Sequence, residues 1–126
     1  MKLRIKGNSL RLRVTRPELE ALGTAGAVVE IVPFPGGAAL KYELRVDSRA
    51  SALAASYRDN VVRVSVPAAD FEAWRKEDQV SLRSSQPTGK SGDLQILIEK
   101  DFACLAPREG EDDSEAFAHP GAGKTC

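Results

Sequence analysis

The sequence is poor in the residues that most often carry catalysis or covalent cross-links. Its 126 residues include one histidine, two cysteines and one tryptophan. Two cysteines do not make the disulfide framework of a small secreted domain. The single histidine, His119, lies in the C-terminal stretch, so the main part of the chain has no histidine for a Ser-His or Cys-His pair. We therefore predict a protein that is not an enzyme and that needs no cofactor.

Long apolar runs are missing as well. No stretch approaches the roughly 18 apolar residues that span a membrane. The first residues alternate charged and apolar side chains without an apolar run, which argues against a signal peptide. Hydrophobic residues make up 42% and charged residues 29%, an ordinary balance for a globular domain. We expect a cytoplasmic, bacterial-type protein with no membrane partner.

Charge is balanced overall but unevenly distributed. Residues 1–100 contain 16 Lys/Arg and 12 Asp/Glu, whereas residues 101–126 contain 2 Lys/Arg and 6 Asp/Glu. Six cations precede the first acidic residue, Glu18. A basic beginning and an acidic end either serve different partners, or the end shields the beginning.

The first half of the chain predicts two hairpins joined by a helix. Apolar and charged residues alternate over residues 2–6 and 9–14, and Gly7-Asn8 between them suits a type II′ turn. Two β-rich runs, Ala27–Phe34 and Ala39–Val46, flank Pro35-Gly36-Gly37 and form the second predicted hairpin.

The helix between these hairpins has clear start and stop signals. Thr15 and Glu18 have the spacing of a capping box. Leu22 is expected in the core, together with Leu19, and Gly23 and Gly26 are expected to end the helix.

A shift of 52 residues places the second half on the first. Neither half can cover its own sheet face, but two halves supply eight strands and two short helices. We predict a mainly β (α+β) fold, a pseudo-two-fold swapped-hairpin-like β-barrel built from two ββαββ halves, by internal duplication. The predicted domain spans residues 1–106, with halves 1–47 and 52–102, and an acidic tail of poor order spans 107–126. The identical pairs are Asn8/Asn60, Arg11/Arg63, Val14/Val66, Glu20/Glu72, Ala21/Ala73 and Val28/Val80.

Both halves resemble the AbrB/MazE swapped-hairpin family. Residues 62–102 have the order of a strand ending at Pro67, a short helix, Glu77-Asp78-Gln79-Val80 and a hairpin, similar to that family's pattern. Gly7-Asn8-Ser9 followed by Leu12-Arg13-Val14 resembles a segment of the MazE-like members. The whole chain is also similar to an uncharacterised bacterial family of this length.

The resemblance implies a barrel that two chains build by exchanging hairpins, here fused into a single chain that is a monomer. It further implies DNA binding through Arg4, Asn8 and Arg13, which match the family's contact positions. In the second half only Asn60 matches, because Ser56 and Ser65 stand where the first half has arginines.

Even without the family resemblance, the residues of the first hairpin make it the strongest candidate site. If Gly7-Asn8 is a two-residue turn, Arg4 faces Arg11 and Lys2 faces Arg13. Such opposed like charges cost roughly 0.2–1 kcal/mol per pair, which DNA phosphates would relieve. Alternatively the cations protect the strand edge or pair with carboxylates such as Glu18, Glu30 or those of the tail. The predicted DNA-binding residues are Lys2, Arg4, Lys6, Asn8, Arg11 and Arg13.

The C-terminal residues contain three further candidate features. The acidic tail, which includes Glu109 and Asp112, is a candidate for docking on a protein partner, for folding back on the basic hairpin, or for solubility alone. Gly121–Thr125 ends like a phosphate-binding loop, but Ala118 stands where its first glycine belongs. Cys104, His119 and Cys126 are too widely spaced for a compact zinc site, so we predict no metal.

The sequence thus favours a DNA-binding, transcription-regulator or antitoxin-like module. The alternative is a non-enzymatic protein-interaction or scaffold barrel that has lost DNA binding. Phe71 and Trp74, at helical spacing, are predicted to be core residues rather than base-stacking ones.

Overall fold

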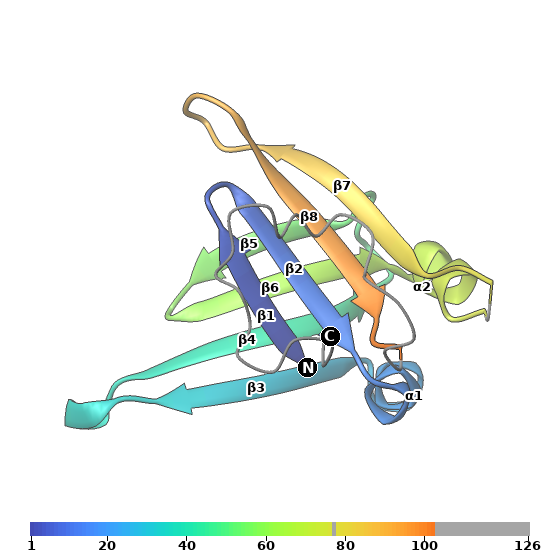
Figure 1. Cartoon of the computed structure of the whole chain (residues 1–126), viewed down its shortest axis with the longest axis horizontal. Coiled ribbons are helices and arrows are strands. Elements are labelled where there is room, and N and C mark those ends of the chain that lie inside the picture. Colours follow the sequence, from blue (N-terminus) through green and yellow to red (C-terminus); the bar gives the residue numbers. More distant parts are fainter. Residues whose placement is uncertain (77, 103–126) are drawn as a thin grey trace, which may run out of the picture.

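A computed structural model of the protein describes residues 1–76 and 78–102. Within these residues the chain forms a mainly β fold with two short α-helices, as predicted (Figure 1). The elements are β1 (Lys2–Lys6), β2 (Ser9–Val14), α1 (Arg16–Ala25), β3 (Ala27–Pro33), the 3-10 turn η1 (Pro35–Gly37), β4 (Ala39–Asp47), β5 (Ala54–Arg58), β6 (Val61–Pro67), α2 (Ala68–Trp74), β7 (Ser81–Pro87) and β8 (Asp93–Lys100).

The strands form two four-stranded sheets, in the orders β1-β2-β8-β7 and β3-β4-β6-β5. Each sheet joins a hairpin from the N-terminal half to a hairpin from the C-terminal half, through the parallel pairs β2–β8 and β4–β6. All other strand pairs are antiparallel. Figure 1 shows the two sheets crossing face to face, with α1 and α2 near one end.

The predicted closure into a barrel is not found in the strand pairing, which leaves two separate sheets. Where β5 approaches β7, a side chain takes the place of a backbone ladder. The Gln86 amide accepts a hydrogen bond from the Ala55 N–H at 2.8 Å and donates one to the Ala55 carbonyl at 2.9 Å. Near them the Ser84 hydroxyl donates to the Leu53 carbonyl. These bonds satisfy edge groups without extending either sheet.

The two halves repeat with two different offsets. Strands β5 and β6 begin 52 residues after β1 and β2, whereas β7 and β8 begin 54 residues after β3 and β4. The predicted constant shift is therefore wrong by two residues for the second hairpin. Val28 corresponds to Leu82 rather than to Val80, since Val28 lies opposite Leu44 and Leu82 lies opposite Ile98. The reason is local: two additional residues separate the start of α2 from β7.

Helix α1 begins as the sequence predicts. The Thr15 hydroxyl accepts a hydrogen bond from the Glu18 N–H, and the Glu18 carboxylate accepts one from the Thr15 N–H, which completes a capping box. Gly26 ends the helix in the left-handed conformation at φ 82°. Gly23 does not end it but lies within the helix, where a Cβ would stand 3.1 Å from the Arg75 guanidinium. Glycine at this position leaves room for that side chain.

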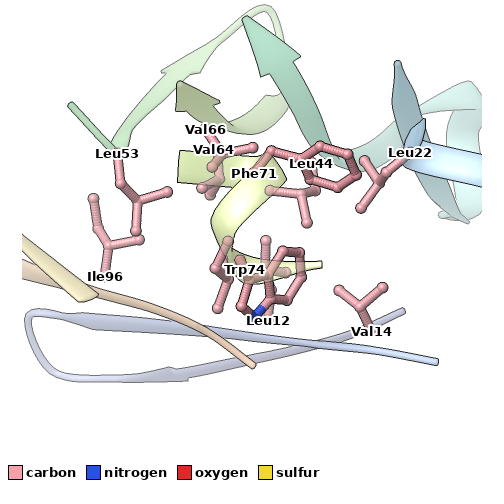
Figure 2. Packing of buried hydrophobic residues seen from close by; sticks show 11 residues of the cluster. Leu12, Val14, Leu22, Leu44, Leu53, Val64, Val66, Phe71, Trp74 and Ile96 are labelled. Carbon is pink, nitrogen blue, oxygen red and sulfur yellow. The ribbon is translucent and has the colours of Figure 1, made fainter. Parts of the chain in front are cut away.

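The core lies between the sheets and includes both helices (Figure 2). Phe71 and Trp74 are buried there, as predicted, with their rings edge to face and their centroids 6.3 Å apart. The Trp74 indole N–H donates to the Val80 carbonyl at 3.1 Å, so the ring is buried without an unsatisfied donor. The buried residues are Leu12, Val14, Leu22, Leu44, Leu53, Val64, Val66, Phe71, Trp74, Ile96 and Ile98.

Trp74→Ala should destabilise the fold more than any surface substitution. Trp74 is fully buried at 0% exposure, so truncation leaves a large cavity and should lower the free energy of unfolding by about 3–5 kcal/mol. Urea unfolding followed by circular dichroism measures the change. Tyr57, at 67% exposure, is the control, and Tyr57→Ala should stay within about 0.5 kcal/mol of the parent. Equal effects for the two variants would contradict this assignment of the core.

Candidate nucleic-acid interface

The outer face of the β1-β2-β8-β7 sheet gathers the predicted cations. Leu12 and Val14 of β2 and Ile96 and Ile98 of β8 point into the core, so the residues between them point outward. We call this surface the basic face. Its charged members among the described strand residues are Lys2, Arg4, Lys6, Arg11, Arg13 and Arg83 against Asp93 and Glu99, a net formal charge of +4.

The register of the first hairpin is the predicted one. Lys2 lies opposite Arg13, and Arg4 lies opposite Arg11. Gly7 has a φ of 53°, whereas Asn8 does not take a positive φ, which fits the predicted type II′ turn. The fold therefore brings these like charges together on neighbouring strands, where they repel one another.

Glu99 lies beside these cations because β8 pairs in parallel with β2. It lies beside Arg13 in the register, and its Oε1 accepts a hydrogen bond from the Arg13 Nε at 2.6 Å. The same oxygen stands 3.7 Å from the Arg11 Nε. All three side chains are partly buried, and the carboxylate lies within ion-pair distance of both guanidinium groups. One carboxylate thus offsets part of the repulsion between the strands.

The basic face also contains a residue that the sequence did not single out. Arg83 of β7 completes a row across the sheet, Arg4–Arg11–Leu97–Arg83. Neither Arg83 nor Glu99 was predicted, because their place on this face depends on β8 pairing with β2. Asn8 lies at the end of the face, where its carbonyl accepts a hydrogen bond from the Gln95 N–H at 2.8 Å.

The outer face of the other sheet is built on the same plan with different charges. Here Glu43 accepts a hydrogen bond from the Arg63 Nε at 2.7 Å and lies 3.5 Å from the Arg45 Nε. This ion pair holds the Arg63 side chain against Glu43. Ser56 and Ser65 stand where the basic face has Arg4 and Arg13. The described strand residues of this face carry four cations, Lys41, Arg45, Arg58 and Arg63, against Glu43 and Asp47.

Glu18 and Glu30, two candidates for neutralising the basic hairpin, bind another group. Both carboxylates accept hydrogen bonds from the Met1 ammonium. Desolvation tends to lower the pKa of that ammonium, but the bonds to Glu18 and Glu30 outweigh it and raise the pKa above its ordinary value. For Glu18 desolvation tends to raise the pKa, and the bonds from Met1 and Thr15 lower it below the ordinary value instead.

Several expectations from the sequence fall outside the described residues. The acidic tail, Cys104, His119, Cys126 and the sequence Gly121–Thr125 all lie beyond residue 102. Within residues 1–76 and 78–102, no three His, Cys, Asp or Glu side chains gather in a way that would hold a metal ion. No helix in that part of the chain is long and apolar enough to cross a bilayer.

Comparison with known proteins identifies a family and no individual relative. The model of a family of unknown function, DUF7009, matches residues 1–121. No curated protein and no solved structure matches the chain significantly. The family's description names no ligand or reaction. The basic face is thus the feature of this chain that bears on its function.

The Glu18 contacts should make the free energy of unfolding depend on pH in the acidic range. Because the pKa of Glu18 is lower in the folded state, its contribution is present above its ordinary pKa and is lost as pH falls through the lowered value. Glu18→Gln should lower the free energy of unfolding near pH 7 by about 1 kcal/mol, the size of a helix-capping interaction. The difference from the parent should shrink towards pH 3.

Urea titrations at a series of pH values measure this change. Glu20→Gln, an exposed substitution on the same helix, is the control and should follow the parent curve. A Glu18→Gln deficit of equal size at pH 7 and pH 3 would show that the charge of Glu18 does not matter.

Proposed function

The chain belongs to this family of unknown function, and we propose that it is a DNA-binding module of the regulator or antitoxin type. The observation that carries the proposal is the basic face, where the described strand residues place six cations and two carboxylates on one side of one sheet. Phosphate contacts supply most of the affinity of such surfaces and release the counterions condensed on DNA.

The geometry of the face suits a phosphate backbone. Lys2, Arg4 and Lys6 follow one another at every second position of β1, about 7 Å apart at the rise of an antiparallel strand. Arginine presents several donors in a planar fork, which matches phosphate oxygens. Strand β1 lies at the edge of its sheet, so its outward side chains are accessible from the side as well as from above. Lys2, Arg4, Lys6, Asn8, Arg11 and Arg13 remain the proposed contacts, and Arg83 joins them.

We further propose that the two halves arose by duplication, as a single-chain form of a swapped-hairpin dimer. The supporting observation is that each sheet takes one hairpin from each half through an equivalent parallel pair. In this scheme the protein is a monomer with one DNA-binding face rather than two. The serines at 56 and 65 support the one-sided arrangement.

A protein-interaction module is the second candidate. Edge strand β3 and the residue after it expose four large apolar side chains: Val29, Ile31, Val32 and Phe34. Exposed apolar clusters often mark contacts between proteins. A chain that has no affinity for duplex DNA at about 50 mM salt, where phosphate contacts are strongest, would favour this second function and reject the first.

The double variant Arg4→Ala with Arg13→Ala should weaken DNA binding at least about tenfold at low salt. Fluorescence anisotropy of a labelled duplex, repeated between about 50 and 200 mM salt, measures the affinity. The slope of log K against log salt should decrease in magnitude by about 2, since two phosphate contacts are lost. The matched control is Lys41→Ala with Arg58→Ala, which removes the same charge from the other sheet and should change affinity less than about twofold. Equal losses in both variants would point to net charge alone.

Glu99→Gln should have the opposite effect on DNA binding. It removes the carboxylate that holds Arg11 and Arg13, and it raises the net formal charge of the basic face from +4 to +5. We expect affinity for duplex DNA to increase about two- to fivefold at about 50 mM salt and the increase to fade at higher salt. Glu43→Gln makes the equivalent change on the other sheet. An equal gain from that control would show that the basic face is not the contact surface.

A further inference from the structure

We infer that an acidic segment of the same chain, residues 109–115, is a second ligand of the basic face and competes there with nucleic acid. This inference rests on the proposed function, since it concerns the regulation of the same surface. Three features identify this segment as the occupant: its charge, the place where the described chain ends, and the length of the connection.

The two partners have complementary charge. Residues 109–115 read Glu-Gly-Glu-Asp-Asp-Ser-Glu, with five carboxylates and no cation. The basic face carries a net formal charge of +4. Glu99 already shows how a carboxylate binds on this face, with one oxygen shared between Arg13 and Arg11. Carboxylates of the segment offer the same chemistry to the neighbouring cations.

The chain leaves the fold beside this surface. Strand β8 is a central strand of the same sheet, and its last residue, Lys100, pairs with Val14 at the end of β2. The Asp101 N–H still donates to the Val14 carbonyl at 2.9 Å, so the chain is held to β2 one residue further on. Figure 1 shows the end of β8 next to the end of β2. Asp101 is therefore two residues beyond Glu99, which lies in the row of Arg13 and Lys2.

Residues 103–108, which connect the described chain to the segment, are long enough to reach the basic face and short enough to keep the segment near it. Six residues, 103–108, separate the described chain from the segment, and they reach at most about 20 Å when extended. Strand β1 lies two strand spacings from β8, about 10 Å away. The seven residues 109–115 span up to about 24 Å, enough to follow β1 or β2 from end to end. Such a short tether gives an effective concentration of the order of millimolar.

A full-length variant that neutralises the segment tests the inference and keeps the chain length. It carries Glu109→Gln, Glu111→Gln, Asp112→Asn, Asp113→Asn and Glu115→Gln. Its affinity for a labelled DNA duplex should be at least about tenfold higher than that of the parent at about 50 mM salt, and the gap should close as salt rises. The matched control removes five exposed carboxylates elsewhere and should change affinity less than about twofold. It carries Glu20→Gln, Asp59→Asn, Asp70→Asn, Glu72→Gln and Asp78→Asn.

A second measurement separates this inference from the proposed function. Amide ¹H–¹⁵N spectra of the labelled parent and the neutralised variant are compared without DNA. We expect shift differences at β1, β2 and β8, with the other sheet unchanged. Such differences without any DNA affinity would support the segment's contact and overturn the DNA-binding function. Spectra that agree throughout the basic face, or DNA binding that is measurable and of equal affinity for parent and variant, would overturn the inference and leave the proposed function standing.

Discussion

The parallel pairing of β2 with β8 is the interaction on which both the fold and the candidate site depend. A two-stranded hairpin such as β1–β2 is marginal in water by itself. Pairing with β8 sets Leu12 beside Ile98 and closes the core between the sheets. The same register sets Arg13 beside Glu99 on the outer side. Because side chains alternate between the two faces of a strand, a shift of one residue would bury arginines and expose the core.

This register also explains how the chain tolerates its opposed cations. Two like-charged pairs across β1 and β2 cost of the order of 1 kcal/mol in all. Glu99 offsets part of that cost, and burial of Leu12 and Val14 on the other face of β2 outweighs it. Among the described strand residues of this face, six cations stand against two carboxylates. This excess of positive charge is the feature that supports the proposed contact with nucleic acid.

Sequence reasoning succeeded where the signals are local and failed where partners are distant. The alternation over residues 2–14 and the turn at Gly7-Asn8 fix the register of the first hairpin, and the Thr15–Glu18 spacing fixes the start of α1. The two-residue offset before β7 was missed because the identity Val28/Val80 made a constant shift look consistent. Glu99 and Arg83 were missed because no local pattern reveals that β8 pairs in parallel with β2. The Gln86–Ala55 hydrogen bonds between β7 and β5 likewise join residues 31 positions apart, which no local pattern reveals.

The two sheets show how one backbone plan supports two different surfaces. In each, a glutamate on a central strand bridges two arginines, but Glu99 lies opposite Arg13 whereas Glu43 lies opposite Arg63, one row further along. Arg63 occupies the position in its sheet that Arg11 occupies in the basic face. The arginine is therefore common to both sheets, whereas the glutamate beside it lies at a different position in each. With serine at 56 and 65, the second sheet loses the cations that would make it a copy of the basic face. Selection on folding alone does not require that difference, because the exposed sides of both sheets tolerate either charge pattern. Among the described strand residues, the difference leaves a net formal charge of +4 on the basic face and +2 on the outer face of the other sheet.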